Sequence, residues 1–244
     1  MSQTLGVHYQ TWRNRPAVNY VLENFRKYYP NAPVRMVSDN GEDFSDLAQK
    51  YNCVFDFENV NIFPKGILVG HPMSGVTDIE PLGAYVWLRR LYDTCKVFDT
   101  DWIVIMEDDV LTRGVVSSFP STHAGGVVSF PLTPLLTAFL MGRNLNNKTW
   151  GYGLCGGGII NRSFFVNAYE KYIQEFDLKF ISNFDGRVYG WSDILLTVFI
   201  IYAGGTYSVW NDVEDKKHNF RPDAAFEHDV KQFYTETSQG SLNK

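Results

Sequence analysis

Three consecutive carboxylates, Glu107, Asp108 and Asp109, follow directly after the apolar run Trp102–Met106. An apolar run without alternation is typical of a strand buried on both faces of a parallel sheet, and ligands collect at the carboxyl ends of such strands. Neighbouring unit charges about 4 Å apart repel by roughly 4 kcal/mol near a protein surface, so the cluster favours a bound counter-charge. Carboxylate oxygens suit Mg²⁺ or Mn²⁺, with substrate phosphates completing the coordination. The alternative is a solvated turn or a helix cap.

A glycine-rich loop is the second candidate site. Gly157 and Gly158 belong to a run of three glycines, which permits close approach of the backbone to a ligand. Trp150 and Tyr152 precede this run and offer rings that stack on sugar faces. The structural alternative is a simple bend in the chain.

Three further side chains fall at the ends of predicted elements. Asp193 lies in the first turn of a helix that begins at Trp191, where a carboxylate can also act as a cap. Asp39 follows the second strand, where it could contact a nucleotide or form an Asx turn. Tyr9 and Gln10, at the end of the first strand, are weaker candidates for nucleotide contact.

Hydrophobic periodicity indicates how these residues are positioned. Strands alternate with amphipathic helices through the first sixty residues, which predicts a parallel α/β sheet. We expect the last thirty residues to wrap the surface. The strands are expected at 5–9, 34–37, 53–57, 102–106, 126–130, 159–160 and 206–210, and the helices at 15–29, 44–51, 79–98, 163–176 and 191–202.

Composition excludes several classes of protein. The formal net charge of −5 argues against a nucleic-acid partner, which requires a basic face. The sequence contains neither an 18-residue apolar stretch nor a signal peptide, so we expect no integral membrane segment. The 3 cysteines form no CxxC pair, which favours free thiols in a reducing compartment. These features predict a cytoplasmic protein, or an excised catalytic domain, of bacterial or viral source.

The order of these features resembles that of glycosyltransferases with the GT-A fold, from Leu5 to about Tyr234. The resemblance implies one α/β (Rossmann-like) domain whose mixed, mostly parallel central sheet is flanked by helices. It implies that residues 1–110 bind a nucleotide sugar and that residues 111–234 carry the acceptor site and the catalytic groups. Residues 235–244 are expected to be a flexible tail.

In that family an acidic motif, written DxD, holds Mn²⁺ or Mg²⁺ against the diphosphate of a nucleotide sugar. The motif stands here as Glu-Asp-Asp. Carried over to this sequence, Asp109 would be the principal metal ligand and Asp108 would face the ribose or the metal. Glu107 would be a supporting polar group. The metal would neutralise charge on the leaving diphosphate.

The segment 224–231 resembles one in which a histidine completes the metal shell and a lysine approaches the diphosphate. His228 is the expected ligand, with His218 as the rival, and an imidazole ligand favours manganese over magnesium. Lys231 lies three residues after His228, which would place both on one helical face.

The resemblance also implies the catalytic group. In inverting members of the family a carboxylate deprotonates the acceptor hydroxyl, and Asp193 is the expected general base, with Asp185 as the alternative. The donor sugar and the acceptor would be bordered by Gly157, Gly158, Trp150, Tyr152 and Trp191.

The sequence thus predicts a metal-dependent glycosyltransferase, which inverts the anomeric configuration if Asp193 is the base; a retaining enzyme is the alternative. We expect it to transfer a sugar from a nucleotide diphosphate, with uridine as the expected base, to a hydroxyl of a glycan or glycoconjugate. The alternatives are a sugar nucleotidyltransferase, a non-catalytic carbohydrate-binding GT-A-like domain, and a two-carboxylate glycosidase using Asp109 and Asp193. A nucleotidyltransferase would carry a basic glycine-rich loop after the first strand, and the segment 8–11 lacks one.

Overall fold

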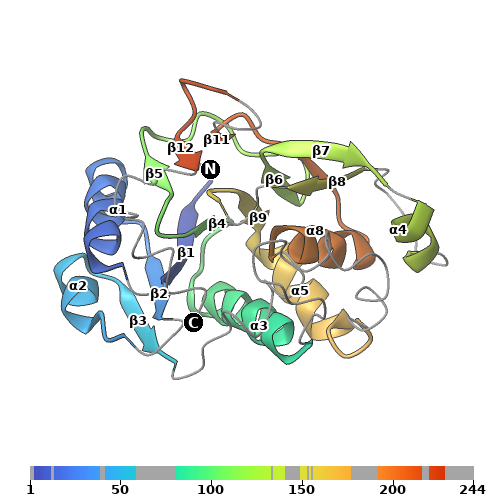
Figure 1. The fold of residues 1–244 in the computed structure, drawn as a ribbon, viewed down its shortest axis with the longest axis horizontal. Helices are drawn as coiled ribbons and strands as arrows, with labels where there is room; N and C mark the ends of the chain where they lie inside the picture. Colours follow the sequence, from blue (N-terminus) through green and yellow to red (C-terminus); the bar gives the residue numbers. More distant parts are fainter. Residues whose placement is uncertain are drawn as a thin grey trace, which may run out of the picture.

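The computed structural model describes residues 3–11, 14–38, 42–58, 81–132, 134–140, 149–152, 154, 156–176, 192–215 and 220–228. At 81–84, 135, 152 and 192–194 it describes the backbone alone. Figure 1 shows the elements, which are β1 (Leu5–Thr11), α1 (Arg15–Tyr28), β2 (Val34–Ser38), α2 (Ser45–Lys50), β3 (Val54–Phe57), α3 (Pro81–Val97), β4 (Trp102–Met106), β5 (Leu111–Thr112), β6 (Ala124–Gly126), β7 (Val128–Pro131), α4 (Pro134–Phe139), β8 (Thr149–Tyr152), β9 (Ile159–Asn161), α5 (Arg162–Tyr172), α8 (Ser192–Tyr202), β10 (Tyr207–Val209), β11 (Val213–Asp215) and β12 (Phe226–His228).

The described central sheet has 7 strands in the order β10-β6-β9-β4-β1-β2-β3. Strands β4, β1, β2 and β3 run parallel to one another, as the alternation of strands and helices predicts. Strand β9 runs antiparallel to both of its neighbours, β4 and β6. The prediction of a mixed, mostly parallel sheet flanked by helices is therefore confirmed.

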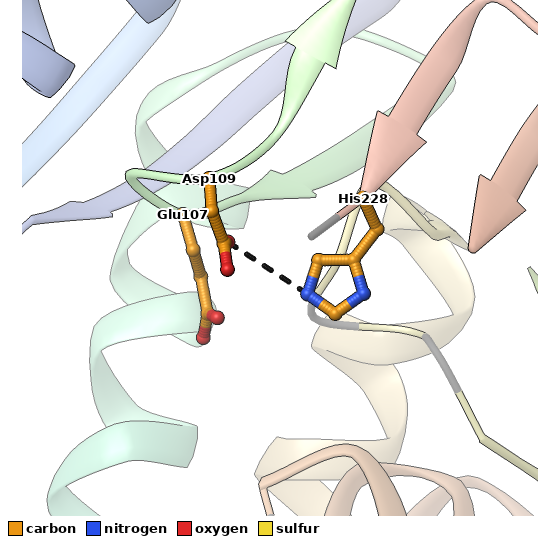
Figure 2. Close-up of side chains that lie close together, drawn as sticks. All are labelled: Glu107, Asp109 and His228. Atoms are coloured by element: carbon orange, nitrogen blue, oxygen red, sulfur yellow. Dashed lines mark ion pairs between the residues drawn. The ribbon is translucent and has the colours of Figure 1, made fainter. Parts of the chain in front are cut away.

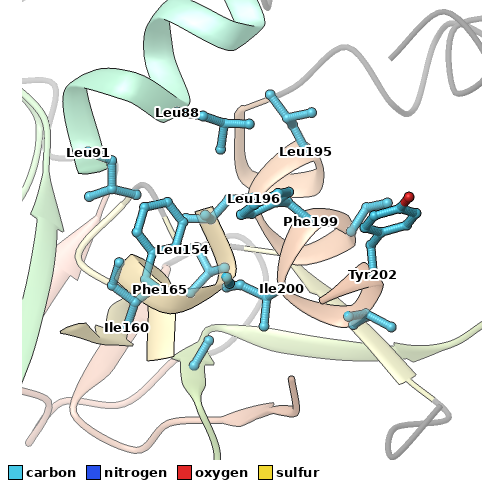
Figure 3. Packing of buried hydrophobic residues seen from close by; sticks show 14 of the residues in the cluster. Leu88, Leu91, Leu154, Ile160, Phe165, Leu195, Leu196, Phe199, Ile200 and Tyr202 are labelled. Atoms are coloured by element: carbon cyan, nitrogen blue, oxygen red, sulfur yellow. The ribbon is translucent and has the colours of Figure 1, made fainter. Parts of the chain in front are cut away.

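Two hydrophobic cores lie on opposite faces of this sheet, and β4 contributes to both. Its residues Trp102, Val104 and Met106 pack in the core on the side of α1 and α2. Ile103 and Ile105 pack in the other core, with residues of α3, α5 and α8. Figure 3 shows this second core, where the three helices meet. The prediction that β4 is a strand buried on both faces is confirmed.

Local sequence explains where the helices begin and which face they bury. The side chain of Asn14 caps α1 by accepting a hydrogen bond from the Ala17 backbone N–H. Asn161 caps α5 in the same way through the N–H of Phe164. Helix α8 is almost entirely apolar, and its residues from Leu195 to Tyr202 are buried, as expected for a core helix.

Two sequence-based expectations are wrong. The strand predicted at 126–130 is divided at Val127: β6 belongs to the central sheet, whereas β7 pairs with β8 in a separate two-stranded sheet. The C-terminal segment does not simply wrap the surface, because β11 and β12 form a three-stranded sheet with β5. Ala225 and Phe226 belong to the hydrophobic core on the α1 side. Burial of Ala225 and Phe226 and the pairing of β11 with β12 therefore hold this part of the C-terminal segment against the core.

Among the described residues, no helix combines the length and the apolar character that a membrane span requires.

Candidate metal centre

Two strands deliver a carboxylate and imidazole cluster to one place. Glu107 and Asp109 follow the carboxyl end of β4, and His228 is the last residue of β12. One ligand atom from each of the three side chains lies within 4.8 Å of the other two. Figure 2 shows the two carboxylates side by side with the imidazole ring facing Asp109. The cluster joins the acidic motif to the C-terminal segment.

The dimensions and donor types of the cluster fit a hard divalent cation. Ligands on opposite sides of Mg²⁺ lie about 4.2 Å apart, since each metal–oxygen bond measures about 2.1 Å. His228 Nε2 lies 3.7 Å from Asp109 Oδ1, so small side-chain rotations would close the shell. Two carboxylates and one imidazole suit manganese better than magnesium, and they leave positions for phosphate oxygens and water.

The middle carboxylate of the motif contacts the first strand. Asp108 is buried, and its Oδ1 accepts a 2.8 Å hydrogen bond from the hydroxyl of Tyr9. Tyr9 is itself only 1% exposed, and its hydroxyl supports the acidic motif. The cluster includes Glu107, expected only as a supporting group, and does not include Asp108. Contact of Asp108 with the ribose and of Tyr9 with the nucleotide stays a prediction.

The glycine run packs directly against the cluster. A Cβ added at Gly156 would lie 2.6 Å from Cδ2 and 2.7 Å from Nδ1 of His228, closer than non-bonded atoms approach. Gly157 has a φ of +93°, a backbone conformation that favours glycine. Gly158 accepts a backbone hydrogen bond from Ile105 in β4. Close packing against His228 thus explains Gly156, and the backbone conformation explains Gly157. Contact of Gly157 and Gly158 with a sugar stays a prediction.

Trp150 does not offer an open face to a sugar. Its side chain is buried in the core beneath α8, and its ring lies 5.2 Å from that of Phe130. We therefore correct its predicted role from sugar stacking to core packing. For Tyr152 the backbone lies in β8, and the direction of its side chain is outside what the structure describes.

The predicted base, Asp193, falls in the first turn of α8, which begins at Ser192 as the sequence indicates. Only its backbone is described, so its role as the base stays a prediction. Several other predicted site residues lie outside the described residues: Asp39, Asp185, Trp191, His218, Lys231 and the tail 235–244. His228 is the last residue of strand β12, so the expectation that it lies on a helix is wrong.

The carboxyl end of β1 presents buried polar groups next to the acidic motif. Strands β1 and β4 pair with Tyr9 opposite Met106, which places Gln10 beside the start of the motif. Gln10 Oε1 and Thr11 Oγ1 are buried and have no hydrogen-bond partner in the part of the chain that the structure describes. Buried polar atoms are nearly always paired, so these two atoms mark a place where a ligand or water would bind.

His8 lies deeper in the same strand and is fully buried. Its Nδ1 lies 2.7 Å from the hydroxyl oxygen of Thr94 in α3. Burial, together with the guanidinium groups of Arg35 and Arg90, lowers the pKa of His8 to about 3. His8 is therefore neutral in the folded protein near neutral pH and cannot act there as a cationic phosphate ligand.

Residues of the C-terminal sheet that support the cluster were missed at the level of the sequence. Asp215 Oδ2 lies 3.1 Å from His228 Nδ1. Arg113, just after β5, forms ion pairs of 2.9 Å with Glu214 and 3.0 Å with Glu227. No periodic pattern marks these carboxylates as buried, since each is also adjacent to a polar residue in the sequence. Their apolar neighbours Val213 and Phe226 were the available signal.

Comparison with solved structures shows that the chain has a known fold. The sequence matches no protein-family model and no curated protein. The galactosyltransferase LgtC, solved in complex with donor and acceptor sugar analogues, is similar in structure with a TM-score of 0.56 and 15% sequence identity. The match covers 98% of this chain and 96% of LgtC. The chain has a glycosyltransferase fold.

A second structure of LgtC, that of an active-site mutant, gives the same TM-score of 0.56 and 15% identity over 98% of this chain and 95% of that chain. GlyE of Streptococcus pneumoniae TIGR4 is more distant, with a TM-score of 0.43 and 10% identity over 96% of this chain and 55% of its own. In this glycosyltransferase fold the cluster of Glu107, Asp109 and His228 lies at the carboxyl end of a parallel strand, where open α/β sheets bind ligands. A shared fold does not by itself define an activity, so the chemistry of Glu107, Asp109 and His228 must indicate the function.

Proposed function

We propose that the chain is a metal-dependent glycosyltransferase that uses a nucleotide diphosphate sugar as donor. The observation that carries this proposal is the cluster of Glu107, Asp109 and His228, in which two carboxylates and an imidazole converge at the carboxyl end of β4. The fold shared with a galactosyltransferase supports it. The acidic motif would serve as the DxD motif in the form Glu107-x-Asp109.

Each group in the cluster has a defined task in this proposal. Glu107, Asp109 and His228 would hold Mn²⁺, or less favourably Mg²⁺. The bound metal would neutralise the charge that develops on the leaving diphosphate. Tyr9 would hold Asp108 and thereby fix the turn that carries the two metal-binding carboxylates. The buried oxygens of Gln10 and Thr11 would accept hydrogen bonds from the nucleotide.

The donor and acceptor assignments are finer proposals. We take uridine diphosphate as the nucleotide, with Asp39 contacting its base or ribose and Lys231 its diphosphate. Residues 1–110 would form the donor half, and residues 111–234 would form the acceptor and catalytic half. Tyr152 and Trp191 would border the acceptor, which is a hydroxyl of a glycan or glycoconjugate.

Asp193 is proposed as the general base, a role supported by its position at the start of α8 in the second half of the chain. A base that activates the acceptor on the face opposite the diphosphate gives inversion at the anomeric carbon. Proton NMR of freshly formed product reports the anomeric configuration directly. An inverted product from the wild-type protein, together with loss of transfer but not of donor binding in Asp193→Ala, supports the assignment. A product with retained configuration, or normal transfer by Asp193→Ala, contradicts it.

Calorimetric titration tests the donor site. Uridine diphosphate and guanosine diphosphate are titrated with and without Mn²⁺, followed by their sugars. We expect one nucleotide to bind only with manganese, and Asp109→Ala to abolish that binding. The matched control is Asp99→Ala, which removes an exposed carboxylate paired with Arg162, before the start of β4 and not at its carboxyl end. Failure of every nucleotide to bind with metal present would overturn the donor site and favour a glycosidase or a carbohydrate-binding domain.

A further inference from the structure

We propose that Asp215 is a positioning residue, one that orients the imidazole of His228 for metal binding. This inference rests on the proposed function, because it concerns how the same metal site is built. His228 Nδ1 lies 3.1 Å from Asp215 Oδ2, within hydrogen-bonding distance. The Asp215 side chain is 3% exposed, and that of His228 is 14% exposed. The contact is therefore largely shielded from water, where a hydrogen bond to a charged group is strong.

The two ring nitrogens of His228 face different carboxylates. Nδ1 faces Asp215, and Nε2 faces Asp109 at 3.7 Å. A neutral imidazole has one N–H donor and one acceptor nitrogen, while an ionised carboxylate only accepts. When Nδ1 donates to Asp215, the lone pair on Nε2 points towards Asp109. That tautomer presents a ligand atom to a cation held by the acidic motif.

The backbone fixes this contact in register. Strands β11 and β12 are parallel neighbours, and Asp215 is the paired residue of His228. Gly156 packs so closely against the ring that a side chain there would overlap it. Arg113 ties the two strands to β5 through Glu214 and Glu227. The imidazole is thus held by a carboxylate and by close packing before any metal arrives.

A carboxylate that holds the second nitrogen of a metal-bound histidine sets its tautomer and its ring orientation, and it raises the basicity of the ligand. Loss of such a partner commonly weakens metal affinity about 10-fold to 100-fold. The ligand atoms that converge on the metal position come from Glu107, Asp109 and His228. Asp215 contacts the far nitrogen of that histidine, so its effect would reach the metal through His228.

The test compares two isosteric substitutions in the same segment. Asp215→Asn keeps the size of the side chain but removes the charge that selects Nδ1 as the donor. Asp212→Asn is the matched control: Asp212 is buried like Asp215, and it accepts hydrogen bonds from Ser117 and Ser118. Manganese affinity is measured by the electron paramagnetic resonance signal of free Mn²⁺. We expect Asp215→Asn to weaken binding about 10-fold to 100-fold, and Asp212→Asn to leave it unchanged.

Nitrogen-15 NMR of the histidines gives a second readout, which reports the tautomer directly. At pH 8 without metal, we expect His228 to carry its proton on Nδ1, and we expect Asp215→Asn to remove this preference. A proton on Nε2 in the wild-type protein would overturn the proposal. So would unchanged manganese affinity in Asp215→Asn when His228→Ala weakens it. If His228→Ala also leaves manganese affinity unchanged, the metal site of the proposed function fails instead, which separates the two failures.

Discussion

Glu107 and Asp109 converge with His228, whereas Asp108, between them, turns towards Tyr9. Three adjacent carboxylates therefore divide into two that can bind a metal and one that holds the motif in place. The acidic motif could be predicted as a candidate site, because its residue types and its position after a strand are visible in the chain. His228 was expected only from the resemblance to a family, and on a helix instead of a strand. Which carboxylates converge could not be predicted, since that depends on the turn after β4 and on the buried hydroxyl of Tyr9.

This division predicts opposite effects for two similar substitutions. Glu107→Gln should weaken Mn²⁺ binding at least roughly tenfold, because a neutral amide is a poorer ligand for a hard cation. Asp108→Asn should leave that affinity within about threefold and instead lower the free energy of unfolding by about 1–3 kcal/mol, since its bond with Tyr9 is charge-assisted. Manganese titration and urea denaturation measure the two quantities. If Asp108→Asn weakens Mn²⁺ binding more than Glu107→Gln does, Asp108 is a metal ligand and this assignment is wrong.

Gly156 gives a prediction about packing at the cluster. In Gly156→Ala the new methyl group would overlap the ring of His228, so the ring must shift and the manganese affinity should fall. We expect a loss of stability of about 1–3 kcal/mol from the overpacking. Gly114→Ala is the control, because its nearest neighbour, the Cα of Ala225, would lie 4.0 Å from the new Cβ. If both variants bind manganese like the wild type, His228 does not depend on this contact.

The short sheet of β5, β11 and β12 brings His228 close to the carboxyl end of β4. Its strands are two or three residues long, and β11 and β12 carry carboxylates, so no hydrophobic period predicts them. Glu214 is fully buried, and Glu227 is 5% exposed. Buried charges require partners, and Arg113 supplies the guanidinium that both contact. The pairing joins segments far apart in the chain, which is why the sequence predicted a surface position for this region.

Arg113→Met tests this clamp. Removal of one partner from a buried ion pair costs about 3–5 kcal/mol, because the remaining charge keeps its desolvation cost. We expect a loss of that order in the free energy of unfolding, measured by urea denaturation, and weaker manganese binding because β12 carries His228. The control is Lys96→Met, which breaks an exposed pair with Glu170. That change should cost about 1 kcal/mol or less. Equal losses in the two variants would show that Arg113 does not clamp the sheet.

At the scale of the whole molecule, one half of the sheet was predictable and the other was not. The parallel direction of β4, β1, β2 and β3 follows from strands that alternate with helices, since such connections give parallel strands. The half containing β9, β6 and β10 has short strands and an antiparallel insertion. Its strands pair with segments far away in the sequence, such as β6 with β10. Val127, for example, divides β6 from β7 without any turn residue at that position.

The buried histidine of β1 links the stability of the whole molecule to pH. The pKa of His8 is lowered from 6.5 to about 3 in the folded protein, by burial first and then by Arg35 and Arg90. Below pH 6.5 the unfolded chain therefore binds a proton at this site that the folded chain does not. Stability contributed by neutral His8 is complete above pH 6.5 and is lost progressively as the pH falls towards 3.

The expected loss between about pH 6.5 and about pH 4.5 is about 2.5 kcal/mol for this group, since each unit of pKa shift corresponds to about 1.4 kcal/mol. Carboxylates titrate in the same range, so the wild-type protein is compared with His8→Gln, which cannot take up the proton. Urea unfolding at both pH values should show a smaller decrease for the variant, by about that amount. Parallel decreases in the two proteins would mean that His8 is accessible to protons in the folded state. A smaller difference between the two decreases would instead place its folded pKa closer to 6.5.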